Sequence, residues 1–351
     1  MFDADGETAI ERALRRAHPG AAPARFAARP AGKDAIAGCL AARVEEPTPH
    51  WLVVSRGFTE LGDKLEEDPE ISGWGFELTC RLPARSSEAP DLGWIMDWMQ
   101  RVADDLAARV SFLDPYHHME IQPAAQGDDV AAIVFVEDVR LEPTRSQNGA
   151  FYFLQMVGLT RDEYAALHAW DARGLVDLVR ERDPLLLLDR GRASLLADPG
   201  FAAAVDEGRE RDGSSTGVLY GVALLWLFEG DELRVHLDVD AAAAVRAAMR
   251  SRLRHGKAMM LFGDRRKNVR PDGSLALRSQ VNLALKPEEG PSEIVSDDDG
   301  PTCLLRLGPD AIDELARELP ETPGSAALAS LPGVSFVVTT RERLREPGYP
   351  R

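Results

Sequence analysis

The segment SGWGFELTCRLP at residues 72–83 alternates between large apolar side chains and side chains that are small or polar. This two-residue period is typical of a β-strand that buries one face. The side chains expected on the buried face are Trp74, Phe76, Leu78, Cys80 and Leu82. Glu77 falls on the opposite face, so we expect its truncation to cost far less stability than the truncation of Trp74, unless the Glu77 carboxylate is paired.

Two glycines, Gly73 and Gly75, begin the second face of this strand. Glycine usually weakens a strand interior, because it packs no side chain and loses more backbone entropy than other residues. A face without side chains also lets another group approach closely. That group is either a helix of the same protein or the backbone or aromatic ring of a partner. Both interpretations stay open, and Gly73 and Gly75 are candidate partner-binding residues.

Helical and extended patterns alternate along the rest of this chain of 351 residues. Apolar side chains at three- and four-residue steps predict helices at residues 7–17, 91–110, 161–170, 175–181, 199–208, 241–253 and 311–319. Apolar runs predict strands at residues 51–58, 131–139, 151–159, 218–228, 232–239, 258–263, 274–285, 303–307 and 334–340. The length favours two domains. We therefore predict an α+β protein with domains at residues 1–229 and 231–351, each a mixed or antiparallel sheet with packed helices.

Composition argues against several classes of function. A formal charge of −17 repels phosphate backbones, so a basic protein partner fits better than nucleic acid. The longest apolar run ends at Glu229, too short for a bilayer, and the N-terminal residues lack the features of a signal peptide. Cys39, Cys80 and Cys303 are too widely spaced for a disulfide framework or a metal site, and we expect them in cores. We predict a cytoplasmic protein without metal, cofactor, nucleic-acid partner or membrane contact.

Two segments resemble catalytic or metal-binding sequences. Residues 213–217, GSSTG, match the G-x-S-x-G pattern of serine hydrolases, which needs a strand before the serine and a helix after it. Here a predicted helix precedes Ser215 and a strand follows, so a turn is the better interpretation and a hydrolase is the disfavoured one. His117 and His118 are adjacent, and neighbouring residues of an extended chain face opposite ways. We interpret them as loop residues and predict no catalytic or metal-binding residue.

Two segments stand out by charge. The densest basic cluster, residues 250–257, contains Arg250, Arg252, Arg254 and Lys257. It is either a solvated helix end whose cations suit the helix dipole or an anchor for acidic groups of a partner, and charge pattern alone does not decide between them. Residues 287–300 are acidic and carry few large apolar side chains, so we predict a mobile loop there.

The segment at residues 72–83 resembles the signature strand of the suppressor of fused family. Further resemblances lie at HWLVVSRGFTELG (residues 50–62), at FYFLQMVGLTRDEYAALHAWDARGLVDLVR (residues 151–180) and at EGRERDGSSTGV (residues 207–218). Trp74, Phe76, Leu78 and Trp170 are the structural signature residues that this resemblance marks. Weaker similarity continues into residues 235–320, as in the second domain of the animal proteins.

The resemblance implies a two-domain, non-enzymatic protein-binding module. The animal members hold a short segment of a Gli-type transcription factor between their domains, and bacterial members are proposed to be immunity proteins against polymorphic toxins. The leading hypothesis is therefore a bacterial immunity-type protein that neutralises a toxin bound in or near the cleft between domains. An adaptor that sequesters a transcription regulator is the alternative. The partner itself and the oligomeric state stay undetermined.

Overall fold

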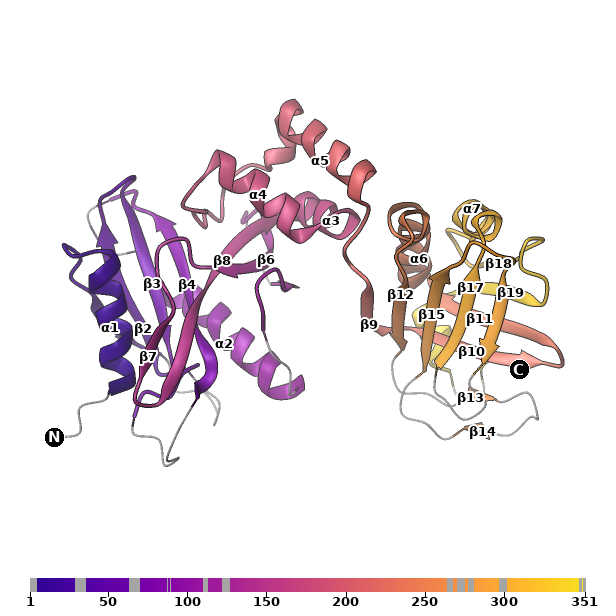
Figure 1. Ribbon diagram of the computed structural model, residues 1–351, viewed down its shortest axis with the longest axis horizontal. Helices are drawn as coiled ribbons and strands as arrows, with labels where there is room; N and C mark the ends of the chain where they lie inside the picture. Colours follow the sequence, from indigo (N-terminus) through magenta and orange to yellow (C-terminus); the bar gives the residue numbers. More distant parts are fainter. Residues whose placement is uncertain are drawn as a thin grey trace. The chain divides into compact units, whose positions relative to one another are not determined.

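The computed structural model describes residues 5–28, 36–62, 70–86, 88, 90–109, 113–121, 127–263, 268–269, 275–276, 281–296, 302–346 and 349. The chain divides into two compact units, each with its own sheets and helices (Figure 1). The first unit comprises Met1–Ala165 and Leu175–Ala202, and the second comprises Ala166–Gly174 and Ala203–Arg351. Helices and sheets are mixed in both, which confirms the predicted α+β class.

The first unit is built on one mixed sheet in the strand order β1-β2-β3-β4-β8-β6-β5, with β7 paired to β8. Its strands are β1 (Ala24–Ala27), β2 (Gly38–Val44), β3 (His50–Arg56), β4 (Ile71–Pro83), β5 (His118–Glu120), β6 (Val130–Glu137), β7 (Thr144–Ser146) and β8 (Gly149–Thr160). Only β4 and β8 pair in parallel among the described strands of this sheet, and β4 lies near its centre. A central strand is covered on both faces.

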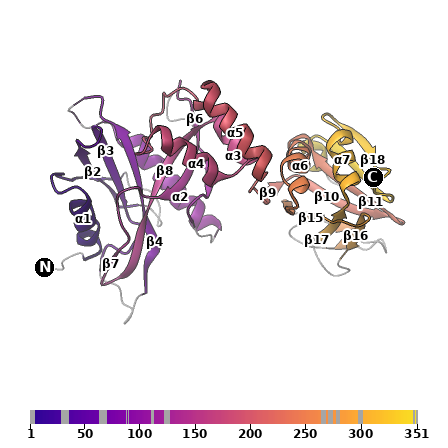
Figure 2. The ribbon, with the colours of Figure 1, turned by 45° about the horizontal axis from the view of Figure 1, so that its top comes forward.

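Two helices, α1 (Asp5–Ala17) and α2 (Gly93–Arg109), cover opposite faces of this sheet (Figure 2). Apolar residues of α1, including Ile10 and Leu14, pack on Leu40, Leu52 and Phe153. The larger core of this unit lies between the sheet and α2. Its main members are Cys39, Val53, Phe76, Leu78, Cys80, Leu82, Ile95, Trp98, Met99 and Val102. Both cysteines of this unit are free and buried, as predicted.

Three further helices follow β8: α3 (Arg161–Ala169), α4 (Ala172–Arg182) and α5 (Pro199–Asp212), with a short 3-10 turn at Leu195–Ala197. The division between the units passes through all three. The predicted cap of α3 is present, because the backbone N–H of Thr160 donates to a Glu163 carboxylate oxygen at 3.0 Å. That carboxylate also pairs with Arg192, which ties the start of α3 to the loop before α5.

The second unit contains two sheets. Their strands are β9 (Val218–Val222), β10 (Leu224–Glu229), β11 (Glu232–Asp238), β12 (Met259–Gly263), β13 (Asn268–Val269), β14 (Leu275–Ala276), β15 (Asn282–Pro287), β16 (Glu293–Ser296), β17 (Thr302–Leu307), β18 (Gly324–Ala327) and β19 (Val334–Thr339). One sheet has the order β14-β13-β10-β11-β19-β18, and the other has the order β16-β17-β15-β12-β9.

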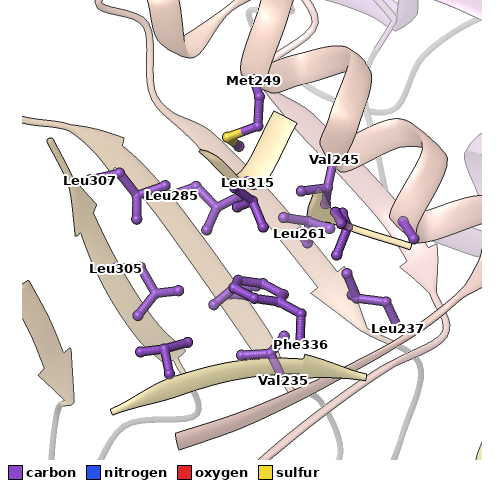
Figure 3. Packing of buried hydrophobic residues seen from close by; sticks show 14 of the residues in the cluster. Val235, Leu237, Val245, Met249, Leu261, Leu285, Leu305, Leu307, Leu315 and Phe336 are labelled. Carbon is purple, nitrogen blue, oxygen red and sulfur yellow. The ribbon is translucent and has the colours of Figure 1, made fainter. Parts of the chain in front are cut away.

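The core of the second unit lies between these sheets and two helices, α6 (Val239–Ser251) and α7 (Pro309–Glu318) (Figure 3). Strand residues such as Val235, Leu261 and Phe336 meet Val245 and Met249 of α6 there. A 3-10 turn (Leu253–His255) follows α6, and α8 (Arg341–Leu344) lies against the other face of the β10 sheet through Leu344. None of the helices in the described ranges is both long enough and apolar enough to cross a membrane.

The predicted domain boundary near Glu229 to Asp231 does not coincide with the division between the units. Glu229 pairs with Glu232 across a two-residue turn, so β10 and β11 form one hairpin inside the second unit. A polar turn such as this has the same composition as a linker, and only the pairing of the flanking strands distinguishes the two. Residues 1–229 and 231–351 are therefore not the observed compact units.

Two other sequence expectations also change. The apolar run at residues 218–228 is two strands, β9 and β10, that belong to different sheets. Gly221, with φ +67°, lies near the end of β9 and allows the chain to turn between them. The predicted mobile loop at residues 287–300 is partly ordered, because β16 pairs with β17 and Ile294 packs on the core. Residues 297–300 lie outside the described residues.

Candidate functional site

The glycines of β4 adopt backbone conformations that other residues rarely reach. Gly73 has φ +56° and Gly75 has φ +82°, and the pairing of β4 with β8 is irregular between Ile71 and Phe76. A Cβ atom on Gly73 would lie 2.4 Å from the carbonyl oxygen of Phe58. The glycines therefore permit a bulge that packs β4 closely on the turn after β3. Close approach of the protein's own backbone, rather than a helix, explains why position 73 lacks a side chain.

This bulge reverses the expected roles of Trp74 and Glu77. Trp74 is 43% exposed, whereas Glu77 is completely buried. The alternation holds only from Phe76 onward, where Phe76, Leu78 and Cys80 enter the α2 core as predicted. Upstream of Phe76 the two positive φ angles turn the chain out of the strand pattern. The prediction that Trp74 is a buried anchor and that Glu77 lies on a tolerant face is wrong.

The Glu77 carboxylate fastens β4 to the end of β3. One carboxylate oxygen accepts the Ser55 hydroxyl at 2.5 Å, and the other accepts the Gly57 N–H at 3.1 Å. Thr59 donates twice to that second oxygen, from its N–H at 3.0 Å and its hydroxyl at 2.6 Å. Burial raises the pKa of Glu77, and these hydrogen bonds act in the opposite direction. The carboxylate thus holds the turn that lies beneath Gly73.

A second buried polar group, Arg81, lies on the same face of β4. Arg81 and Asp138 form a two-point ion pair, with nitrogen–oxygen distances of 2.7 Å and 2.8 Å and no exposed side-chain surface on either partner. Gln155 of β8 and Thr79 also contact this pair. Burial alone would raise the pKa of Asp138, but the Arg81 charge and the hydrogen bonds outweigh burial and lower it. The pair joins β4 to the segment that follows β6.

The signature residue Trp170 is buried, as its apolar ring suggests, and its ring packs against two glycines. A Cβ atom on Gly174 of α4 or on Gly208 of α5 would lie 2.5 Å or 2.2 Å from the Trp170 ring. The indole N–H donates to the Asp212 carboxylate at 3.0 Å. Hydrogen bonds from Arg211 and then Trp170 lower the pKa of Asp212 to about 2. Trp170 thus fills the space that the two glycines leave in these helices.

Replacing Gly208 by alanine should destabilise the second unit by about 1–3 kcal/mol, as overpacking usually does. In a helix without this contact, alanine is instead preferred over glycine by up to ~1 kcal/mol. Gly200→Ala in the same helix is the matched control, because its Cβ would meet only the ends of two side chains, the Asp198 carboxylate at 3.2 Å and the Arg182 guanidinium at 3.9 Å. Urea unfolding measures both. Equal effects of the two substitutions would contradict the packing of Trp170 on Gly208.

The predicted basic cluster is largely used inside the second unit. Arg252 donates to the carbonyl oxygens of Ser214 at 2.8 Å and Ala258 at 2.5 Å. Arg250 donates to Ala316 O at 3.1 Å, and Lys257 donates to Asp212 O at 2.6 Å. Arg254 is about half exposed and pairs with Asp313 at 2.6 Å. These contacts join α6 and the following turn to neighbouring segments, so of the four side chains Arg254 is the one best placed to meet a partner.

The segments that resemble catalytic sequences show no catalytic arrangement. Ser215 follows α5 and precedes β9, which is the reverse of the order that a serine nucleophile requires. Its backbone N–H donates to Trp170 O at 2.6 Å, a contact with a distant segment of the chain. His118 lies in β5 against the Tyr164 hydroxyl, and His117 accepts the Asp114 N–H. In the described ranges, His, Cys, Asp and Glu side chains form no group of three that could hold a metal ion.

The apolar pattern of residues 218–228 does not separate the edge strand β9 from β10. Strand β9 ends the β12 sheet, and among the described strands it pairs only with β12. The Met260 N–H donates to Gly217 O at 2.8 Å, so by alternation the backbone groups of Val218 and Tyr220 point away from the sheet. Val218 is 41% exposed and Tyr220 is 69% exposed. Gly221 within the apolar run was the signal that could have separated β9 from β10.

The Tyr220 ring stacks on Phe262 of β12, with ring centroids 5.1 Å apart and an angle of 11° between the planes. The edge also contains no charged residue and no proline, the features by which proteins usually prevent pairing of an exposed strand. Backbone donors and acceptors therefore lie beside an exposed tyrosine that stacks on a partly buried phenylalanine. Such an edge can accept a further strand.

Sequence comparison matches part of the chain, most of it in the first unit, to a known family. The family model described as Suppressor of fused protein (SUFU) matches residues 32–193, which include β4 and Trp170. This part of the chain belongs to the suppressor of fused family. The mouse Suppressor of fused homolog is 30% identical over 179 residues, and the human homolog is 29% identical over 179 residues. Each match covers 47% of this chain and 37% of the relative, so it spans little more than a third of those proteins.

Solved structures extend the likeness in fold to almost the whole chain. Drosophila Suppressor of Fused matches with a TM-score of 0.73 and 15% identity, covering 95% of this chain and 96% of that one. The Sufu–Fu complex crystal structure matches with a TM-score of 0.50 and 20% identity, over 57% of this chain and 97% of that one. Of the four signature residues that the resemblance marks, Phe76, Leu78 and Trp170 are buried in the present structure, whereas Trp74 is exposed.

Proposed function

We propose that this suppressor of fused protein is a protein-binding module that receives an extended segment of a partner along β9. The observation that carries the proposal is the apolar edge of β9, with backbone groups directed outward at Val218 and Tyr220. A strand added there gains main-chain hydrogen bonds, and its side chains alternate between the two faces of the sheet. The similar Sufu–Fu complex supports a binding role, because that relative is seen in complex with another protein.

The net charge of this chain and the aromatic rings beside β9 indicate which kind of partner segment would bind there. A partner side chain next to Tyr220 and Phe262 gains most from an apolar or aromatic group. The formal charge of −17 favours association with a basic protein, mainly by speeding the encounter. We therefore propose an extended, apolar segment within a basic partner. Arg254 remains a proposed contact for an acidic residue of that partner.

Val218→Pro tests the proposal with little risk to the fold. Proline removes the outward N–H and blocks an added strand, yet it is tolerated on an edge strand when its nitrogen faces solvent. We expect the affinity for the partner co-purified from the native host to fall at least tenfold with an unchanged thermal midpoint, measured by calorimetry. Thr216→Pro, just before the strand, is the control. Unchanged affinity for Val218→Pro would remove β9 as the binding edge.

The identity of the partner would distinguish two more specific proposals, an immunity-type protein and an adaptor. An immunity-type protein would bind a toxin and abolish its toxicity when the two are co-expressed, and its gene would lie beside the toxin gene. An adaptor would bind a transcription regulator and alter its output without any toxicity to suppress. We favour the immunity-type role, in keeping with the bacterial members that the sequence resembles.

We do not propose an enzymatic role. A hydrolase would have to use Ser215, whose position after α5 and before β9 does not supply the strained strand-to-helix turn of a serine nucleophile. Loss of a purified hydrolytic activity in Ser215→Ala would reverse this assignment.

A further inference from the structure

The first unit carries an exposed apolar site of its own at the start of β4. Among the described residues, the large hydrophobic side chains with the greatest exposure are Ile71, Trp74, Val218 and Tyr220. Two of them belong to β9, and the other two, Ile71 at 58% and Trp74 at 43%, belong to β4. Exposed tryptophan is costly to leave in water, and Trp is among the residues that contribute most to protein interfaces.

The backbone of Trp74 is held in a fixed conformation. Its N–H donates to Phe58 O at 2.7 Å, and it lies between Gly73 and Gly75, both at positive φ. The turn that carries Phe58 is itself held by the buried Glu77 carboxylate. The backbone that presents Trp74 is thus fixed before any partner arrives, so binding loses little conformational entropy there.

The neighbouring segments are fixed in the same way. The Glu60 N–H donates to the Ser72 hydroxyl at 3.0 Å, and the Asn148 amide donates to Glu60 O at 2.9 Å. Ser72 and Asn148 are both buried, with 0% and 1% of their surfaces exposed. Buried polar side chains therefore hold the backbone beneath an exposed apolar surface. Their hydrogen bonds fix the position of the segment that carries Trp74 and leave the tryptophan exposed.

Acidic side chains flank this surface. Glu60 and Glu70 are exposed, and each belongs to a segment in backbone contact with the start of β4 or β8. Arg145 lies across β8 from Ile71 and is already engaged in an interaction. The exposed apolar side chains therefore sit beside net negative charge, which favours a cationic partner surface.

We propose that Trp74 and Ile71 form a second protein-docking surface, which inserts into an apolar pocket bordered by lysine or arginine on a partner protein. This surface comprises only residues of the first unit and is separate from β9. A surface of this kind would select partners by the shape of the pocket that receives Trp74. A strand added at β9 would instead be bound mainly through hydrogen bonds to its backbone.

Site-specific photocrosslinking in the native host tests this surface directly. The probe is p-benzoylphenylalanine, placed at position 71 in one variant, at position 220 in a second and at the exposed position 101 of α2 as the control. We expect position 71 to crosslink to a residue that borders an apolar pocket with Lys or Arg beside it. The crosslinked peptide, identified by mass spectrometry, names both the partner and the contact. Position 101 should give no such product.

Affinity for the purified crosslinked partner provides the second measurement. Trp74→Ala should weaken binding at least tenfold, and Glu60→Lys with Glu70→Lys should slow association and reduce its salt dependence, with the thermal midpoint unchanged in each. Unchanged affinity for Trp74→Ala, crosslinks only to a second copy of this chain, or no crosslink at position 71 would each overturn the proposal. Crosslinking at position 220 alone would leave the β9 proposal standing, and crosslinking at position 71 alone would leave only the Trp74 surface.

Discussion

Glu77→Ala should lower the free energy of unfolding by about 3 kcal/mol or more, although its neighbour Trp74 looks like the more important residue in the sequence. The substitution leaves the Ser55 hydroxyl, the Gly57 N–H and both Thr59 donors without their acceptor. Each buried polar group left without a partner costs roughly 1–3 kcal/mol, reduced where water can enter. Chemical denaturation monitored by circular dichroism measures the loss.

Trp74→Ala is the matched comparison on the same strand. Because Trp74 is 43% exposed and outside the α2 core, we expect it to cost less than about 1 kcal/mol. Glu137, which is exposed at the end of β6, supplies a carboxylate control with an effect within about 0.5 kcal/mol. A larger loss for Trp74→Ala than for Glu77→Ala would restore the assignment based on alternation and contradict the bulge.

The pH dependence gives an independent check on Glu77. Burial raises its folded pKa, so the folded state holds the carboxyl proton more tightly than the unfolded chain does. The stability that this group contributes is complete below its unfolded pKa and declines as the pH rises through its folded pKa. Glu77→Gln cannot lose a proton, so this decline should disappear in the variant.

Arg81→Met should destabilise the first unit by about 3–5 kcal/mol, the usual range when one member of a buried ion pair is removed. Asp138 would keep a charge without its counter-ion, at a site where neither side chain of the pair is exposed. Arg85→Met is the control, because Arg85 pairs with Asp189 on the surface, with 73% of its side chain exposed. Surface pairs contribute about 0–1 kcal/mol.

The double variant Arg81→Met with Asp138→Leu distinguishes the contribution of the ion pair to stability from the contribution of side-chain packing around it. Removing both charges should recover part of the stability lost in Arg81→Met, because no charge then remains buried alone. Additive losses in this cycle would show that Arg81 contributes by packing instead. The lowered folded pKa of Asp138 also implies that its contribution is present above its unfolded pKa and is lost as the pH falls through the folded one.

Local pattern determined most of the elements and the class of the fold. The period of two placed Phe76, Leu78 and Cys80 in a core, and the helical periods placed Ile95, Met99 and Val102 opposite them. These assignments succeed because a side chain's face follows from its spacing along one strand or helix. The cap at Thr160 and Glu163 was equally visible, since it involves residues three apart. The family could also be recognised from these segments.

Features that join distant segments were decided only by the tertiary structure. Glu77 is buried because Ser55, Gly57 and Thr59 surround it, and Gly73 lacks a side chain because Phe58 approaches it. Arg252 is an internal contact because the carbonyl oxygens of Ser214 and Ala258 accept its hydrogen bonds, although the sequence around it is typical of a charged helix end. Whether a polar residue is exposed depends on partners far along the chain, and spacing carries no information about them. The sequence therefore determined which elements form, and the tertiary structure decided which polar residues hold them together and which apolar ones, Trp74 and Tyr220, remain exposed.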